Sequence, residues 1–341
     1  MGADATPLLA VRDLTIALPV GGRMVNLIES VTFALGAREI MGIVGESGSG
    51  KSLTALAIMG LIDVPGARIA GSVRYRGREL AGLPQRAFRA LRGREIAMVF
   101  QDPMTAFTPV YTIGWQIDEQ IRTHRRVGRA EARTRTVRLL GDMGVPDPER
   151  VAGRYPHQLS GGLRQRAMIA MALSCDPSLL IADEPTTALD VTVQAQILDL
   201  LRGLRRDFGS SVLLITHDMG VVAETCDRTM VLYSGMVAEH GPTAALFVQP
   251  GHPYSAALLD SIPPLHGPRP ARLPAIPGSP PAPADRPAGC AFAPRCAHAH
   301  PACAVRPALM AGGAGEVACV LPAEGRPLPP RGACAVAGGG A

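Results

Sequence analysis

Short runs of apolar residues, separated by glycine, proline and charged residues, make up the first third of the chain. Runs with strand character cover residues 11–19, 25–35 and 71–75. Residues 40–44 form a continuous apolar run of the kind found in buried strands, and residues 52–61 then have helical character. This pattern predicts a series of short strands, one of which leads through a loop into a helix.

The middle of the chain alternates between strand and helix patterns. Residues 95–100, 179–182, 211–215 and 229–233 have the pattern of strands, and residues 112–171 that of helices. Strands that alternate with helices are typical of a mostly parallel sheet, so the predicted fold class is α/β. The helical stretch carries a cluster of arginines, namely Arg122, Arg125, Arg126, Arg129, Arg133, Arg135 and Arg138. Acidic residues interrupt this cluster, which favours a solvated helix face over a nucleic-acid patch.

The composition changes after about residue 251. Residues 263–288 are too rich in proline for a helix or a central strand, so we expect an extended linker there. Five of the seven cysteines follow this linker. We therefore expect a small, separate, cysteine-held module at the C-terminus.

Bulk composition excludes several classes of protein. A hydrophobic fraction of 47% with 18% charged residues argues against disorder. The chain has no long uncharged apolar run and no signal-peptide pattern at its N-terminus, so we expect a cytosolic protein without a transmembrane segment. The net charge of +5 suits nucleic acid, an anionic membrane surface or a nucleotide, and does not choose among them.

A phosphate-binding motif contains the single lysine among the 34 basic residues. The motif reads Gly45-Glu46-Ser47-Gly48-Ser49-Gly50-Lys51-Ser52 and fits the P-loop pattern. Such a loop wraps backbone N–H groups around phosphates, which leaves room for a compact ammonium but not for a wide guanidinium. A lysine at this place in so arginine-biased a chain therefore indicates that the protein binds a nucleoside triphosphate.

A second nucleotide signal follows about 130 residues later. Asp183 and Glu184 end an apolar strand, where ligands of open α/β sheets bind. One carboxylate can hold the shell of Mg²⁺ while the other polarises a water that attacks the γ-phosphate. Between the two signals, Ser160-Gly161-Gly162 opens a helix and can present a hydroxyl and backbone donors to an anion.

These segments, in this order, resemble the ATP-binding cassette family over roughly residues 8–245. In that resemblance the segments are Walker A (Gly45 to Ser52), the Q-loop residue Gln101, the signature (Ser160-Gly161-Gly162), the end of Walker B (Asp183-Glu184), the D-loop (Ala188-Leu189-Asp190) and the switch histidine His217. The resemblance implies a P-loop NTPase core with an N-terminal antiparallel β-subdomain and a helical subdomain at about residues 102–170. The cassette then covers residues 1–250.

The resemblance also implies a role for each of these residues. Lys51 neutralises phosphate oxygens, Ser52 and Asp183 hold Mg²⁺, and Glu184 is the general base or positions the attacking water. His217 and Gln101 sense the γ-phosphate and the metal. Ser160, Gly161 and Gly162 act in trans on a partner cassette, so a head-to-tail dimer is implied. The cofactors are ATP and Mg²⁺.

Two positions depart from the family pattern. Leu163 stands where many members of the family have glutamine, and Leu18 stands where an aromatic side chain usually stacks on adenine. Stacking on a base contributes roughly 1–3 kcal/mol in nucleic-acid systems. We therefore expect weaker ATP affinity or weaker base selectivity.

The tail narrows the resemblance to the ATPase subunits of bacterial dipeptide/oligopeptide importers. The segments that carry it are Gly251-His252-Pro253-Tyr254-Ser255, Ile276-Pro277-Gly278, Gly289-Cys290 and Pro294-Arg295-Cys296. The function implied is ATP hydrolysis that energises peptide import, with nickel or glutathione as alternative cargo. A soluble cassette ATPase that acts on nucleic acid or ribosomes is a second class, disfavoured because such proteins carry tandem or split cassettes.

The tail cysteines form a candidate metal site made of Cys290, Cys296, Cys303 and Cys319, with Cys334 beyond. In a reducing compartment four clustered cysteines favour a metal over disulfides. Their wide spacing suits a four-iron four-sulfur cluster, and zinc or metal-free thiols are the alternatives. Cys175 and Cys226 stand alone and are expected in the core.

The resemblance finally implies partners and a location. The partners are a second ATPase subunit, which favours a heterodimer, two transmembrane permease subunits and an extracytoplasmic substrate-binding protein. Nucleic acid is not an expected partner. The chain is then expected at the cytoplasmic face of the inner membrane, with residues 251–341 as its C-terminal region.

Overall fold

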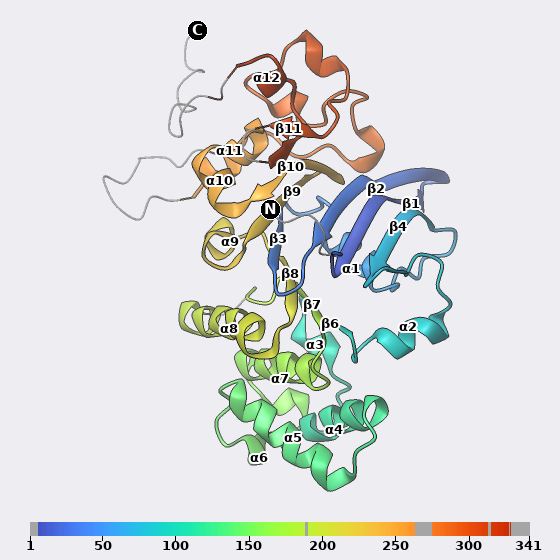
Figure 1. Cartoon of the computed structure of the whole chain (residues 1–341), viewed down its shortest axis with the longest axis vertical. Coiled ribbons are helices and arrows are strands. Elements are labelled where there is room, and N and C mark those ends of the chain that lie inside the picture. The colour runs from blue at the N-terminus through green and yellow to red at the C-terminus, as the bar shows by residue number, and fades with distance from the viewer. Residues whose placement is uncertain (1–5, 188–189, 263–274, 313–314, 327, 329–341) are drawn as a thin grey trace.

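The structure is a computed structural model that describes residues 6–187, 190–262, 275–312, 315–326 and 328. Its longest axis runs from a helical part to the C-terminal region, with two β-sheets between them (Figure 1). Within these described ranges, no helix has both the length and the apolar character needed to cross a membrane.

The N-terminal strands form an antiparallel sheet in the order β2–β1–β4–β5. The bounds are β1 (Leu9–Val20), β2 (Arg23–Leu35), β4 (Arg68–Tyr75) and β5 (Arg78–Glu79). Leu9 lies opposite both Leu35 and Tyr75, and all three are buried in a core cluster that also contains residues of the larger sheet. The predicted antiparallel β-subdomain is confirmed.

The larger sheet has the strand order β11–β12–β10–β9–β3–β8–β7–β6. The bounds are β3 (Ile40–Val44), β6 (Ile96–Val99), β7 (Leu179–Asp183), β8 (Ser211–Ile215), β9 (Arg228–Tyr233), β10 (Met236–Pro242), β11 (Met310–Gly312) and β12 (Gly315–Val317). The strands from β6 to β9 are parallel, whereas β10, β11 and β12 pair antiparallel. The predicted α/β class with a mostly parallel core is confirmed.

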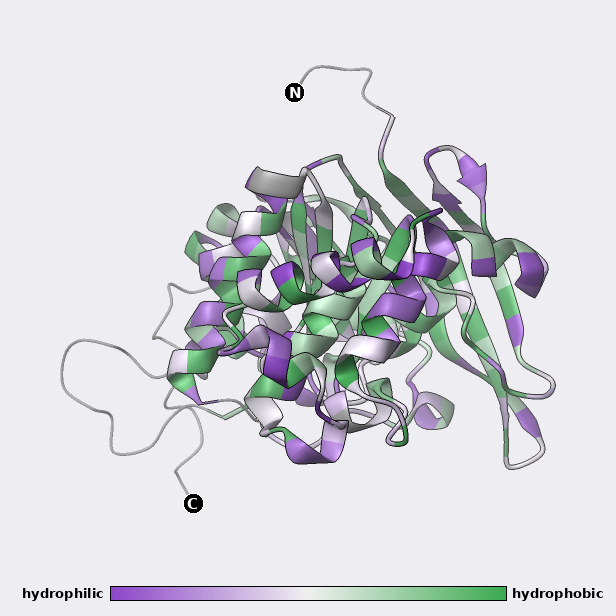
Figure 2. Cartoon of the chain, turned by 90° about the horizontal axis from the view of Figure 1, so that it is seen from below, coloured by the Kyte–Doolittle hydropathy of each residue, from purple (hydrophilic) through white to green (hydrophobic). Residues whose placement is uncertain are grey.

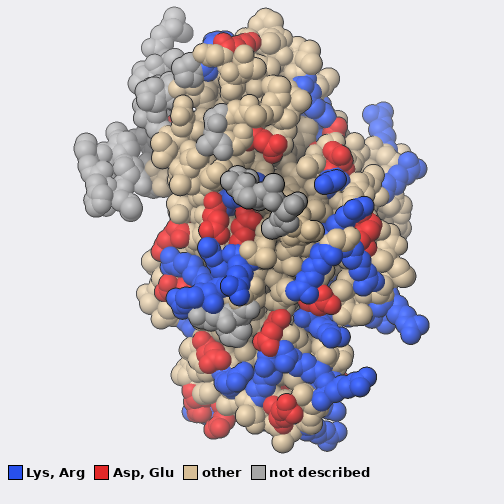
Figure 3. All heavy atoms as spheres, in the orientation of Figure 1, with Lys and Arg blue, Asp and Glu red and all other residues tan. Residues whose placement is uncertain are grey.

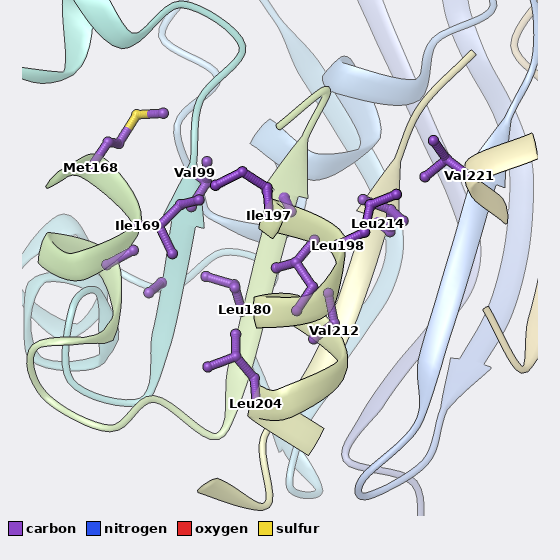
Figure 4. Packing of buried hydrophobic residues seen from close by; sticks show 14 of the residues in the cluster. Val99, Met168, Ile169, Leu180, Ile197, Leu198, Leu204, Val212, Leu214 and Val221 are labelled. Carbon is purple, nitrogen blue, oxygen red and sulfur yellow. The ribbon is translucent and has the colours of Figure 1, made fainter. Parts of the chain in front are cut away.

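Helices cover the central sheet and close the core around it. The helices next to the sheet are α1 (Lys51–Ile58), α2 (Gln85–Leu91), α8 (Val191–Gly203), η2 (Leu204–Phe208), α9 (Met219–Thr225), α10 (Thr243–Val248) and α11 (Pro253–Asp260). Ile169, Leu180, Ile197 and Leu198 point toward one another between strands and helices (Figure 4). β3, β7 and β8 are buried at every position, as expected for strands covered on both faces. Hydrophobic residues accordingly follow the inner strands in Figure 2.

The helical part lies at the end of the molecule opposite the C-terminal region (Figure 1). Its elements are α3 (Pro103–Ala106), α4 (Ile113–His124), α5 (Arg129–Asp142), α6 (Pro148–Ala152), η1 (Pro156–Gln158) and α7 (Gly161–Leu173). Basic and acidic side chains are mixed over this part in Figure 3. Arg125 and Arg135 both pair with Asp176, and Arg122 pairs with Glu119. These ion pairs fit the predicted solvated helix face.

The C-terminal region continues the central sheet and is not a separate module. Its elements are η3 (Pro283–Asp285), η4 (Ala293–Arg295), η5 (Pro301–Ala304), β11, β12 and α12 (Val320–Ala323). β12 pairs with β10, with Glu239 opposite Val317. The prediction of a separate module was therefore wrong in this respect, because the sheet edge that β10 presents is paired by a strand of the tail. Part of the predicted proline-rich linker, residues 263–274, lies outside the described residues.

Candidate functional site

The P-loop connects β3 to α1, as the sequence predicts. The Lys51 side chain is buried, and its Nζ donates to the carbonyl oxygens of Gly45 at 2.8 Å and Glu46 at 3.0 Å. Gly45 and Gly50 have φ angles of 151° and 101°. A Cβ at Gly45 would lie 2.1 Å from the carbonyl oxygen of Leu232, so only glycine lets the loop approach β9 this closely.

Lys51 is a cation in a partly desolvated, acidic surrounding. Burial lowers its pKa, and the nearby carboxylates of Glu184, Asp183 and Glu46 oppose that shift. The compact ammonium group of Lys51 therefore has little contact with solvent. An anion bound in the loop would add to the groups that favour the charged form.

Ser52 and Asp183 lie together at the start of α1 and the end of β7. The Ser52 hydroxyl donates to Oδ1 of Asp183 at 3.0 Å, and Asp183 is buried. Burial raises the pKa of Asp183, while the hydrogen bond from Ser52 lowers it. A hydroxyl and a carboxylate oxygen are ligands that Mg²⁺ prefers, so this pair fits the predicted magnesium site.

Glu184 is the meeting point of the predicted catalytic residues. Gln101 Nε2 donates to its Oε2 at 3.1 Å, and His217 Nδ1 lies 3.3 Å from its Oε1. Glu184 has a left-handed φ of 46°, and its N–H donates to the carbonyl of Ile215 on the neighbouring strand. This unusual backbone conformation turns the side chain toward the residues that follow β6 and β8.

Thr187 was not predicted and also contacts Glu184. Its hydroxyl donates to Oε2 of Glu184 at 2.9 Å. The only sequence signal was its position three residues after the carboxylate. Thr187 therefore helps to fix the orientation of the Glu184 side chain.

The predicted signature segment begins α7. Ser160 is the N-cap residue, and its hydroxyl accepts the N–H of Leu163 at 3.4 Å. Ser160 and Gly161 are exposed, so their outer side is open to a second molecule. Leu163 packs against the core from a partly buried position. The action of Ser160, Gly161 and Gly162 in trans stays a prediction.

Two other predicted elements are only partly described. Ala188 and Leu189 of the D-loop lie outside the described residues, while Asp190 caps α8 by accepting the N–H of Val193 at 2.9 Å. Leu18 lies near the end of β1 opposite Val25 and packs against the core. Its effect on adenine binding stays a prediction.

The four predicted metal-ligating cysteines line one small cavity. Cys290, Cys296, Cys303 and Cys319 are four of the twelve residues around a cavity of about 10 Å³, and the Cys290 N–H donates to the Cys303 carbonyl at 2.9 Å. Burial raises the pKa of the Cys296 thiol to about 11, and the other three cysteines add to this shift. Among the described residues, no three His, Cys, Asp or Glu side chains are arranged to hold a single metal ion. Cys334 lies outside those residues.

The two remaining cysteines are buried in the core, as predicted. Cys175 and Cys226 are free thiols, 5% and 8% exposed. Burial raises the pKa of Cys226 to about 12. Both are therefore structural residues of low reactivity.

An exposed aromatic pair lies a short distance along the chain from Gln101. Tyr111 stacks on Trp115 with 4.0 Å between ring centroids and 17° between ring planes. Tyr111 and Trp115 are 44% and 46% exposed, and the neighbouring Val110 is 70% exposed. Aromatic side chains that are so exposed are typical of interaction surfaces.

Comparison with known proteins gives two family matches. The model described as "ABC transporter" matches residues 28–187, and the model described as "Oligopeptide/dipeptide transporter, C-terminal region" matches residues 238–303. The chain is similar to a protein of Brucella abortus (strain 2308) that is named for peptide import and ATP binding. The two are 52% identical over 297 residues, which are 87% of this chain and 89% of the relative.

Two further similarities extend over most of the chain or of its cassette. The oligopeptide transport ATP-binding protein OppD of Salmonella typhimurium is 47% identical over 321 residues, which are 94% of this chain and 95% of that protein. A solved ATP-binding cassette, a dimer in a post-hydrolysis state with ADP and phosphate, is 28% identical with a TM-score of 0.63. The matched region covers 69% of this chain and 98% of the solved chain.

Proposed function

The chain belongs to the ABC transporter family, and from this premise we propose that it hydrolyses ATP to energise the import of peptides through a membrane permease complex. The observation that carries the catalytic part is the convergence of Gln101 and His217 on Glu184, beside the Lys51 loop. The names of the relatives support peptides as the cargo, ahead of nickel or glutathione.

The proposed catalytic sequence uses groups that already lie close together. Lys51 and the loop N–H groups bind the phosphate chain, and Ser52 and Asp183 hold Mg²⁺, which offsets phosphate charge. Glu184 accepts a hydrogen bond from the attacking water and orients it toward the γ-phosphate. Gln101 contacts one oxygen of the Glu184 carboxylate and His217 contacts the other. The orientation of this carboxylate therefore changes when Gln101 or His217 binds another group.

The proposed site is completed by a second cassette. Ser160, Gly161 and Gly162 lie at an exposed helix start, and we assign them to the phosphates bound by a partner subunit. A structural relative is a dimer, which supports this arrangement. We favour a heterodimer with a different ATPase subunit, because peptide importers of this type commonly pair two.

The surface formed by Val110, Tyr111 and Trp115 is the proposed contact with the permease. It follows Gln101 in the chain, and the proposed route from this surface to Glu184 is the hydrogen bond that Gln101 donates to the Glu184 carboxylate. The location proposed is the cytoplasmic face of the membrane, where the chain binds two permease subunits. An extracytoplasmic binding protein delivers the peptide.

Co-purification tests this assignment. A tagged chain extracted from detergent-solubilised membranes is expected to retain two permease subunits and a second ATPase. Replacement of Trp115 by Ala should reduce permease recovery several-fold without affecting nucleotide binding, because this exposed indole stacks on Tyr111 and belongs to none of the nucleotide motifs. Enrichment of ribosomes in place of permeases would contradict the assignment and favour the soluble cassette class.

The cysteine cavity is the proposed site of a four-iron four-sulfur cluster. Such a cluster takes its four thiolates at separate corners, and the four cysteines line one cavity, which supports this set of ligands. The cavity of about 10 Å³ has room for about one water molecule, so it must widen when the cluster binds. The positive charge of the metal would offset the burial that disfavours the thiolates. Iron and zinc analysis of anaerobically purified protein tests this: Cys303→Ser should lose iron, and the matched control Cys226→Ser should retain it. Protein free of both metals would exclude the cluster.

A further inference from the structure

Two residues of the tail, Tyr254 and Arg295, contact Glu46 of the P-loop, and a third tail segment holds Arg295 in place. The carbonyl oxygens of residues 276–278 accept hydrogen bonds from the Arg295 guanidinium, at 2.7 Å for Pro277. The same guanidinium donates to both carboxylate oxygens of Glu46, at 2.6 and 3.0 Å. Tyr254, on α11, accepts the backbone N–H of Glu46 at 2.8 Å. These contacts span more than 200 residues of sequence.

The network is buried and well fixed. The Arg295 side chain is 5% exposed and its partner Glu46 is 27% exposed. Arg295 also donates to the Tyr233 hydroxyl at 3.3 Å, and the Tyr233 ring packs edge-on against Tyr254 at 4.6 Å. A two-point contact between a guanidinium and a carboxylate fixes orientation as well as charge.

Glu46 is an anionic side chain in a loop that must bind a polyanion. Its backbone carbonyl also accepts a hydrogen bond from Lys51, the cation of that loop. An unpaired Glu46 carboxylate would repel the phosphates and compete for Lys51. Arg295 offsets this charge and fixes the carboxylate through both of its oxygens.

We propose that Arg295 is a positioning residue for nucleotide binding, which neutralises and orients Glu46 so that the P-loop accepts the phosphates of ATP. This inference rests on the proposed function and assigns the C-terminal region a part in the ATP site. Residues of α11 and of the region that follows it thereby support a loop near the start of the chain.

The test measures ATP affinity of the full chain by equilibrium binding. Arg295→Gln should weaken ATP binding about tenfold, because it leaves Glu46 unpaired beside the phosphates. Arg295→Lys keeps the charge and should recover part of the loss. The double variant Arg295→Gln with Glu46→Gln should bind ATP more tightly than Arg295→Gln alone, since the unpaired charge is gone. A purely structural role predicts the opposite, an additional loss in the double variant.

Arg286 provides the matched control. It also comes from the tail, its side chain is likewise 5% exposed, and it pairs with Glu29 on β2 at 2.8 Å. It contacts the turn at Ser234, and the next residue of that turn, Gly235, donates to the Ser49 carbonyl of the P-loop. The Arg286 ion pair, however, is with Glu29 and not with Glu46. Glu46→Gln should therefore give no recovery of ATP affinity in an Arg286→Gln background.

Hydrogen–deuterium exchange without nucleotide distinguishes failure of the Arg295 inference from failure of the proposed function. Residues 45–52 should exchange faster in Arg295→Gln than in wild type, because Glu46 loses the two-point contact that holds its side chain. Unchanged exchange and affinity in Arg295→Gln would overturn the inference. Wild-type protein that fails to bind ATP, with exchange altered as expected, would instead overturn the proposed function alone.

Discussion

Lys51 occupies a position where size and shape, more than charge, select the side chain. Its ammonium reaches two carbonyl oxygens of its own loop, and three carboxylates lie close enough to raise its pKa against burial. A guanidinium is planar and wider, so it would displace the loop backbone. The single lysine of the chain is thus explained by the geometry of one loop.

Lys51→Arg therefore tests a steric claim. The variant keeps the charge and should lose ATP hydrolysis by about a hundredfold or more, with little change in thermal stability. Steady-state hydrolysis and a melting curve measure the two effects. Near-normal turnover would contradict the steric argument.

At this scale the sequence predicts residues that belong to local motifs and misses those joined by tertiary contacts. Lys51, Ser52 and Asp183 follow from their spacing and from the strands before them. Thr187 and the pairing of Glu46 with Arg295 do not, because no local pattern connects positions 249 residues apart. Their partners exist only once the sheet has brought the tail to the P-loop.

Among the elements, buried parallel strands were the most predictable. β3 and β8 match the predicted runs because a strand covered on both faces is apolar throughout. β10 was missed, since it contains Glu239 and His240 and ends at Pro242. The Glu239 carboxylate accepts hydrogen bonds from the N–H groups of Gly251 and His252 in the tail. These partners lie outside the short stretch of sequence from which a strand is predicted.

A buried histidine, His252, is the N-cap residue of helix α11. The Nδ1 atom of His252 accepts the N–H of Tyr254 at 3.0 Å, and burial lowers the pKa of His252 from 6.5 to about 4. The unfolded chain therefore binds this proton first as the pH falls. Stability contributed by the neutral ring is present above pH 6.5 and is lost progressively between pH 6.5 and 4.

His252→Asn should reduce this pH dependence. Asparagine caps helices well and does not titrate in this range. The midpoint of thermal unfolding should fall less steeply from pH 6.5 to 4 in the variant than in wild type, a difference of up to about 3 kcal/mol in stability. Parallel curves for the two proteins would show that another group controls the acid sensitivity.

On the scale of the whole molecule, the site is placed by strands that are adjacent in the sheet. β3 delivers the P-loop, β7 delivers Asp183 and Glu184, and β8 between them leads to His217. The C-terminal region extends the central sheet, because its strand β12 pairs with β10. It also contacts the site, because Arg295 donates to the Glu46 carboxylate of the P-loop. Its docking on the cassette was the least predictable part of the fold, because proline-rich and cysteine-rich segments have no periodic pattern.

The central claim is that ATP hydrolysis at Glu184 drives peptide import by a complex that contains this chain. Uptake of a labelled peptide into vesicles that carry the full transporter, with ATP on the side of this subunit, measures it directly. Wild type should import peptide only with ATP, and Glu184→Gln should bind ATP but import at least about a hundredfold more slowly. Equal uptake by the two proteins, or wild-type ATP hydrolysis without peptide uptake, would contradict the claim.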